Sequence, residues 1–274
     1  NLAAFAGLAN ALCERGFSAP RILASDFEHG FLVLEDLGDD LIARLIPQQL
    51  HEGTIYALAV DVLAAIYRST FGDHVSAGGE DWPLLAYDDT ALMAEADLFL
   101  EWYLARHAGV ELDDEARAEW VRLWTAAFKR LESCAPGLVL RDFHAENLLH
   151  LPDRDGEAAL GLLDFQDALI GHPAYDLVSL LEDARRNVDR KLAIPLKARF
   201  VEKAGIADSA GFDAAYAVLG AQRNAKILGI FVRLAVRDGK QRYLDLLPRV
   251  ARHFVADLQP PALMELSWKV QKLG

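Results

Sequence analysis

Three short apolar runs constrain the fold most, because they interrupt a region whose other apolar residues mostly have helical spacing. They cover 138–140, 148–150 and 160–163, flank polar clusters and are predicted to be strands. Nearly everything else after Leu41 shows the spacing expected of helices. The sequence therefore predicts a mostly helical lobe with one small β insert.

Residues 1–38 have a different pattern. A helix is predicted over 2–15, ending at Gly16, and two short strands over 21–27 and 30–34. The second strand contains the continuously apolar run FLVL, so we expect it to be buried on both faces. A turn or linker follows at Glu35.

The remaining elements are predicted from apolar spacing and from turn residues. We expect a loop over 71–86, which is rich in Gly, Asp and Pro. Further helices are predicted at 52–69, 90–107, 113–133, 175–187, 191–204, 211–236 and 240–258.

The charge of the chain disfavours two classes of partner. With 41 acidic and 28 basic residues, the formal net charge is -13. Such a chain repels nucleic acid and anionic membranes, so we expect neither as a partner. The acidity is compatible with a cationic substrate, but it more often only keeps a protein soluble.

The cysteines and the chain start bear on the compartment. Cys13 and Cys134 lie far apart without a C-x-x-C neighbour, so we expect two reduced thiols in the cytoplasm, with a single disulfide as the alternative. No apolar run is long enough to span a bilayer. Because the sequence begins at Asn1 and not at Met, we expect its natural start to be missing.

The polar residues beside the predicted strands suit phosphoryl transfer. Asp142 follows the first strand, Asn147 comes five positions later, and Asp164 ends the third strand. One carboxylate can orient an attacking hydroxyl and accept its proton, while an amide oxygen and a second carboxylate are ligands that Mg²⁺ accepts. Alone, each residue is also explained as a turn former, but that explanation does not account for the repeated association with apolar strands.

This arrangement resembles the catalytic loop and metal-binding motif of the protein-kinase-like superfamily, and most of all the aminoglycoside phosphotransferase and choline kinase family. Gly171-His172-Pro173-Ala174-Tyr175-Asp176-Leu177 is similar to the segment whose Asp braces the catalytic loop in that family. The run FLVLEDLG is similar to its strand and adenine-binding hinge. VLEDLGDDL, FLEWYL and LRDFHAENLL resemble bacterial cell-wall sugar kinases that phosphorylate N-acetylmuramate and N-acetylglucosamine at the anomeric hydroxyl.

The resemblance implies an ATP- and magnesium-dependent kinase of small molecules, with one role for each matching residue. Asp142 would be the catalytic base, Asn147 and Asp164 the magnesium ligands, and Asp176 a structural brace. Glu35, Asp36 and Leu37 would form the hinge that binds adenine through backbone groups.

The implied fold is α+β and two-lobed, with an incomplete small lobe and a mostly helical large lobe. Residues 1–37 would be the remnant of the N-terminal lobe with the hinge, and residues 38–274 the C-terminal catalytic lobe.

The sequence departs from the family pattern in the elements that cover the ATP phosphates. No lysine precedes Lys129, and no glycine-rich loop precedes Phe31. Either these elements are missing from this sequence or the protein is a degenerate kinase. The intact set of Asp142, Asn147 and Asp164 favours the first explanation, and we do not expect the 274 residues alone to be active.

The acceptor is less constrained than the chemistry. Glu101, Trp102 and Tyr103 could contact a sugar, although aromatic stripes more often belong to a core. Arg223 lies in the polar run Gln222-Arg223-Asn224 of an apolar helix, where it is either a structural ion-pair former or a receptor for the lactyl carboxylate of N-acetylmuramate.

Two alternatives to a sugar kinase stay open. One is an aminoglycoside or choline kinase, which would need an acidic pocket for a cationic substrate, and the other is a non-catalytic pseudokinase.

Overall fold

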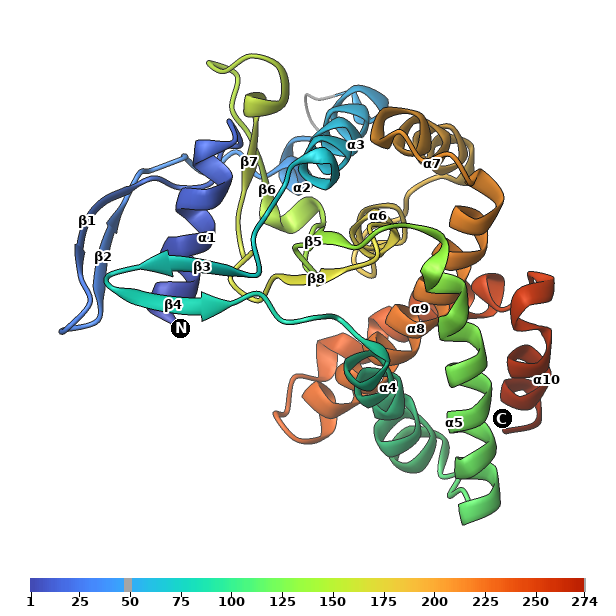
Figure 1. Cartoon of the computed structure of the whole chain (residues 1–274). Helices are drawn as coiled ribbons and strands as arrows, with labels where there is room; N and C mark the ends of the chain where they lie inside the picture. The colour runs from blue at the N-terminus through green and yellow to red at the C-terminus, as the bar shows by residue number, and fades with distance from the viewer. Residues whose placement is uncertain (47–50, 274) are drawn as a thin grey trace. The chain divides into compact units, whose positions relative to one another are not determined.

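The computed structural model describes residues 1–46 and 51–273, shown with their element labels in Figure 1. The chain divides into two compact units. The first comprises Asn1–Ala86, Pro136–Asp183 and Val188–Ala207, and the second comprises Tyr87–Ala135, Ala184–Asn187 and Asp208–Gly274. The two compact units are not the two predicted lobes, which were expected to meet after residue 37. That boundary stays a prediction.

The first unit contains all of the strands found in the described residues, and it begins with a helix. Its helices are α1 (Leu2–Glu14), α2 (Ile42–Leu45), α3 (Glu52–Arg68), α6 (Ala174–Leu181) and α7 (Arg190–Ala204). Its strands are β1 (Ile22–Asp26), β2 (Phe31–Leu34), β3 (His74–Ala77), β4 (Glu80–Pro83), β5 (Gly137–Val139), β6 (Leu148–His150), β7 (Leu160–Leu162) and β8 (Leu169–Gly171).

The second unit is helical in its described residues. It contains α4 (Asp89–Leu98), a π-helix (Phe99–Ala108), α5 (Asp114–Phe128), α8 (Ser209–Val236), α9 (Leu247–Asp257) and α10 (Met264–Leu273). The predicted helix at 240–258 is a 3-10 helix (Gln241–Leu246) followed by α9. The predicted helix at 175–187 ends earlier, at Leu181, and α10 was not predicted.

Four antiparallel two-stranded sheets form in the described part of the chain, in the pairs β1-β2, β3-β4, β5-β8 and β6-β7. The β6-β7 pair matches Leu148 with Leu162 and His150 with Leu160. It is extended on both edges by isolated bridges, because Leu41 pairs with Leu149 and Ser18 pairs with Gly161. The β insert predicted from the sequence is confirmed, and the N-terminal segment joins it through Ser18.

The prediction of a loop over 71–86 was wrong, because β3 and β4 form a hairpin there. Ala77 pairs with Glu80, so Gly78 and Gly79 are the two residues of the turn. Both have positive φ, 62° and 81°, the conformation that a two-residue hairpin turn of type I′ needs and that glycine adopts at little cost. The glycines therefore mark a tight turn between two strands, and Figure 1 shows the hairpin lying along α1.

The prediction that FLVL is buried on both faces was also wrong. Phe31 is 68% exposed and Val33 is 56% exposed in β2. In the described part of the chain, β2 pairs only with β1, so no further strand covers this short hairpin. An apolar run therefore does not imply burial where the sheet has only two strands.

The β3-β4 hairpin packs closely on α1. A Cβ atom at Gly7 of α1 would lie 2.9 Å from Val75 Cγ2 and 3.1 Å from the backbone nitrogen of Ser76, so only a glycine permits this approach without a shift. Val75 itself is 7% exposed. The contact holds the hairpin on the helix and buries an apolar side chain between them.

We predict that Gly7→Leu destabilises the protein by about 2 kcal/mol, because the added side chain has to displace β3. Urea denaturation measures the change. The control is Gly72→Ala, whose Cβ would have its nearest neighbour at 3.6 Å and should change stability by less than about 0.5 kcal/mol. Equal stability of Gly7→Leu and wild type would contradict this packing.

Candidate active site

The loop between β5 and β6 presents Asp142 to solvent. Backbone hydrogen bonds tighten it: the Asp142 N–H donates to the Leu140 carbonyl at 2.9 Å, and the His144 N–H donates to the Asp142 carbonyl at 3.1 Å. Asn147 closes the loop by donating its N–H to the His144 carbonyl at 2.8 Å. The Asp142 side chain is thus exposed on a backbone whose course is fixed by consecutive tight turns.

The structure brings Asn147 and Asp164 together beside Asp142. The Asn147 Nδ2 group donates to the backbone carbonyl of Asp142 at 3.0 Å and to Asp164 Oδ2 at 3.3 Å. Strand pairing causes this proximity, because Asn147 directly precedes β6 and Asp164 follows the end of β7. The Leu163 N–H continues the ladder by donating to the Asn147 carbonyl at 3.0 Å.

Both non-glycine residues with positive φ in the described part of the chain lie at this cluster. Arg141 has a φ of 71° and Asp164 a φ of 58°. The left-handed conformation is uncommon for residues with a Cβ atom, and it persists where the surrounding contacts impose it. Gln166 adds one such contact, because its Nε2 donates to Asp164 Oδ1 at 2.7 Å. The backbone is therefore held in a specific, unfavourable shape next to the polar cluster.

The donor set of this cluster fits magnesium. Asn147 offers an amide oxygen and Asp164 a carboxylate, and oxygen atoms are the ligands that this hard cation requires. In the described residues no group of three or more His, Cys, Asp or Glu side chains could enclose a metal ion. A site with few protein ligands suits magnesium, which usually keeps several waters and completes its shell with substrate phosphates.

Asp176 binds the start of the loop that carries Asp142. Its Oδ2 accepts a hydrogen bond from the Leu140 N–H at 2.6 Å, and its Oδ1 accepts one from the Arg141 N–H at 2.8 Å. The carboxylate is 3% exposed and lies in the first turn of α6, where the helix dipole favours a negative charge. The carboxylate of Asp176 thus binds backbone groups at the start of the loop that carries Asp142.

His172 is a buried residue beside this brace that the sequence did not single out for a role. It is 8% exposed, and its Nδ1 accepts a hydrogen bond from the Ala174 N–H at 3.2 Å. Burial lowers the pKa of His172 to about 4, so the imidazole is neutral near pH 7. The sequence around His172 gives no signal that this histidine is buried and not exposed, because a histidine before a proline and a helix occurs in both situations.

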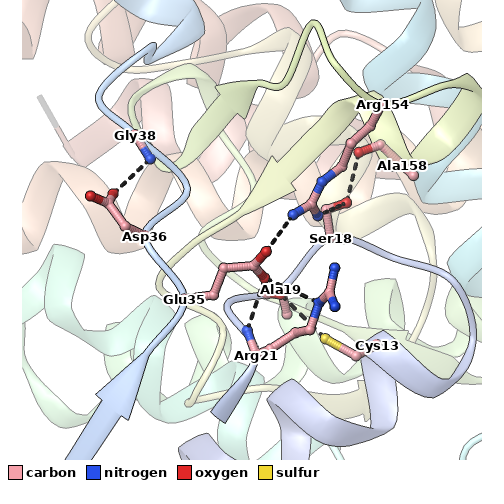
Figure 2. A network of polar contacts seen from close by, with 9 residues as sticks. All are labelled: Cys13, Ser18, Ala19, Arg21, Glu35, Asp36, Gly38, Arg154 and Ala158. Atoms are coloured by element: carbon pink, nitrogen blue, oxygen red, sulfur yellow. Dashed lines mark hydrogen bonds and ion pairs between the residues drawn. The ribbon is translucent and has the colours of Figure 1, made fainter. Parts of the chain in front are cut away.

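The predicted hinge follows β2, and its acidic side chain is bound by the protein itself (Figure 2). Glu35 Oε1 accepts from Arg154 Nη2 at 2.7 Å, while Glu35 Oε2 accepts from the Arg21 N–H at 3.3 Å. Asp36 Oδ1 accepts from the Gly38 N–H at 2.8 Å in an Asx turn. These side chains shape the segment, which leaves backbone groups as the predicted contacts to a base.

Arg154 and Ser18 were missed as residues of this region. Arg154 lies 119 positions after Glu35, in the turn between β6 and β7, so no local pattern links the two. Cys13 also lies nearby, and its Sγ donates to the Ala19 carbonyl at 3.2 Å. Burial, with a smaller contribution from Glu35, raises the pKa of the Cys13 thiol, which fits the expectation of an unreactive cysteine. Cys13 and Cys134 are both free.

The predicted substrate residues lie in the second unit, and their role stays a prediction. Glu101 is exposed on the π-helix, and Trp102 beside it is half-buried. The Tyr103 ring stacks on Phe99 with centroids 5.1 Å apart. Arg223 is 4% exposed in α8, which leaves both of its predicted roles open.

The sequence matches a known family over most of its length. The model of the phosphotransferase enzyme family matches residues 1–217. The N-acetylmuramate/N-acetylglucosamine kinase of Caulobacter vibrioides is 44% identical over 263 residues, which cover 96% of this chain and 72% of that relative.

Solved structures show the same fold at low sequence identity. A choline/ethanolamine kinase family protein from Mesorhizobium loti is similar with a TM-score of 0.62 and 17% identity, covering 98% of this chain and 82% of that one. An ADP-bound aminoglycoside phosphotransferase is similar with a TM-score of 0.54 and 17% identity, covering 90% and 81%. The predicted α+β, protein-kinase-like fold is therefore confirmed.

In the described residues no helix is both long and apolar enough to cross a membrane.

We predict that Asp176→Asn in the full-length gene product lowers kcat and destabilises the protein by about 2 kcal/mol, because an amide offers one acceptor oxygen to the two N–H groups that the carboxylate now binds. Steady-state kinetics and urea denaturation measure both effects. Asp153→Asn is the control, since Asp153 is exposed in the turn between β6 and β7. A fully active and stable Asp176→Asn protein would show that the loop does not depend on this carboxylate.

We predict that His172 makes folding less stable as the pH falls from its ordinary pKa of 6.5 toward 4. The unfolded chain takes up a proton in this window and the folded chain does not, so stability rises with pH there. His172→Asn keeps an acceptor for the Ala174 N–H but cannot titrate. Between pH 7 and pH 5, wild type should lose about 2 kcal/mol more stability than this variant in urea denaturation. Equal losses in both proteins would contradict a neutral buried His172.

Proposed function

Since the chain belongs to the phosphotransferase enzyme family, we propose that it transfers the γ-phosphoryl group of ATP to the anomeric hydroxyl of N-acetylmuramate or N-acetylglucosamine. The observation that carries the acceptor is the relative from Caulobacter vibrioides, which is named for these two sugars and matches 96% of this chain. The cluster supports the chemistry, because it holds the exposed carboxylate of Asp142 beside two proposed oxygen ligands, Asn147 and Asp164.

In this proposal Asp142 orients the acceptor. Its exposed carboxylate accepts a hydrogen bond from the sugar hydroxyl and takes the proton as the hydroxyl oxygen attacks the γ-phosphorus. The bond between the γ-phosphorus and the β–γ bridging oxygen breaks, and ADP leaves with that oxygen. Because Asp176 binds the backbone next to Asp142, the carboxylate is held in position before the acceptor arrives.

Asn147 and Asp164 would hold magnesium. When bound, the ion would neutralise charge on the phosphate oxygens. The Asp164 carboxylate accepts hydrogen bonds from Gln166 on Oδ1 and from Asn147 on Oδ2, and together with the backbone conformation at Asp164 these contacts restrict its orientation. The two proposed ligands therefore already lie side by side, which supports a shared metal site.

The nucleotide base would lie against the backbone of Glu35, Asp36 and Leu37. Protein contacts occupy the Glu35 and Asp36 side chains, which supports a role for backbone groups in base binding. Nucleotide binding without catalysis is the second candidate, and the observation in its favour is the absence of lysine before Lys129 in this sequence.

The acceptor site would draw on the π-helix and α8. π-helices are rare and often occur at functional sites, which supports Glu101 and Trp102 as sugar contacts. The stacking of Tyr103 on Phe99 favours a packing role for that ring. A buried Arg223 could receive the lactyl carboxylate of N-acetylmuramate, whereas an aminoglycoside or choline would call for acidic contacts.

The proposed substrates also suggest where the activity belongs. N-acetylmuramate and N-acetylglucosamine are sugars of the bacterial cell wall, so the enzyme would act in cell-wall sugar recycling. ATP as the phosphoryl donor and two free cysteines support a cytoplasmic location.

We predict that the full-length gene product with Mg-ATP gives a sugar 1-phosphate signal in phosphorus NMR. The acceptor panel contains N-acetylmuramate, N-acetylglucosamine, an aminoglycoside and choline. Asp142→Asn should lower the rate at least about 100-fold, because it removes the proton acceptor. Asp153→Asn, an exposed carboxylate outside the cluster, serves as the matched control.

The products separate the alternatives. Phosphate on the aminoglycoside or on choline would keep the mechanism and overturn the sugar substrate. Nucleotide binding with no product from any acceptor would favour the non-catalytic candidate. Full activity of Asp142→Asn would remove Asp142 from the reaction.

A further inference from the structure

Arg154 lies in the turn between β6 and β7, and its guanidinium binds the predicted hinge with one arm and Ser18 with the other (Figure 2). Its Nη2 donates to Glu35 Oε1 at 2.7 Å, and its Nη1 donates to Ser18 Oγ at 2.7 Å. The three residues come from three distant parts of the chain. One planar side chain therefore fixes two segments at once, as arginine does in two-pronged contacts.

The contact with Arg154 is the more sheltered of the two that Glu35 makes to basic side chains. The Glu35 and Arg154 side chains are 21% and 26% exposed, whereas that of Arg21 is 67% exposed. Arg21 Nε lies 3.4 Å from Glu35 Oε2, a longer contact that water screens. Removing Arg154 would take away the shorter of these two contacts and leave the Glu35 carboxylate with the more exposed Arg21 side chain as its basic partner.

Ser18 connects Arg154 to the strand that leads to Asp164. Ser18 is 2% exposed. Its hydroxyl donates to the Ala158 carbonyl at 2.7 Å and accepts a hydrogen bond from Arg154. Its own carbonyl accepts from the Leu162 N–H at 2.9 Å. Leu162 ends β7, two residues before Asp164, so the frame around Arg154 includes the strand next to the metal-binding pair.

We propose that Arg154 is a positioning residue for the nucleotide. It sets the distance between the segment Glu35–Leu37 and the β6-β7 hairpin, whose open end carries Asn147 and Asp164. A nucleotide has to reach from the base contacts to the metal-bound phosphates, so this distance decides how well it fits. The inference rests on the proposed function, because it takes the hinge as the base site.

The test uses the full-length gene product and four variants: Arg154→Gln, Arg154→Lys, Glu35→Gln and the double variant Arg154→Gln/Glu35→Gln. Arg21→Gln is the comparator, because it also removes a positive charge beside Glu35 but at an exposed position. Calorimetric titration with Mg-ADP gives the Kd, steady-state kinetics give separate KM values for ATP and sugar, and thermal denaturation reports folding.

We expect Arg154→Gln to raise the Kd for Mg-ADP and the KM for ATP about tenfold, with the KM for sugar changed less than about twofold. Arg21→Gln should raise the Kd less than about threefold. The double variant should bind like the worse single variant, because both changes break the same contact. Arg154→Lys keeps the charge but lacks the planar guanidinium, so its Kd for Mg-ADP should lie between those of wild type and Arg154→Gln. This variant also keeps the result interpretable if Arg154→Gln does not fold.

An unchanged Kd in Arg154→Gln, effects that add in the double variant, or equal rises in both KM values would each overturn the positioning role. If wild type phosphorylates a sugar while Arg154→Gln binds Mg-ADP normally, only this inference fails. If wild type binds Mg-ADP but phosphorylates no acceptor, the proposed function fails, and the Kd values still decide the role of Arg154.

Discussion

The arrangement of the loop that carries Asp142 depends on the two hydrogen bonds that the Asp176 carboxylate accepts from the N–H groups of Leu140 and Arg141. They satisfy two N–H groups at the point where β5 gives way to the loop, and they hold Arg141 in the left-handed conformation that turns the chain toward Asp142. The carboxylate is itself fixed, because every residue of α6 from Ala174 to Leu181 is buried. A buried carboxylate thus connects a rigid helix to a loop whose own regular structure is one short 3-10 helix, Ala145–Asn147.

The residues predicted to carry the chemistry were accessible from the sequence because their signals are local. Asp142 and Asp164 follow short apolar strands and Asn147 precedes one, and antiparallel pairing of β6 with β7 brings Asn147 and Asp164 together. The helices α1, α3 and α7 were also recovered within about two residues of their bounds, since each has a long apolar periodicity. The spacing of residues along the chain is sufficient to predict an element that is long or a motif that lies within one loop.

The features that the sequence did not reveal depend on contacts between distant segments. The exposure of Phe31 follows from the small number of strands in its sheet and not from its neighbours in the chain. β8 is only three residues long and exists because Leu169, Ile170 and Gly171 pair with the three residues of β5. Arg154 looks like one more charged residue in a turn until its partners Glu35 and Ser18 are placed beside it.

The backbone conformation at Asp164 has a consequence for how this protein can change during evolution. At a φ of 58° asparagine and aspartate are tolerated far better than β-branched residues or most others. An Asp164→Asn replacement could therefore keep the same chain path, because this backbone conformation does not select for the charge. A copy of the protein that lost the proposed magnesium ligand in this way would keep its fold, and it would differ at this position by a single side chain.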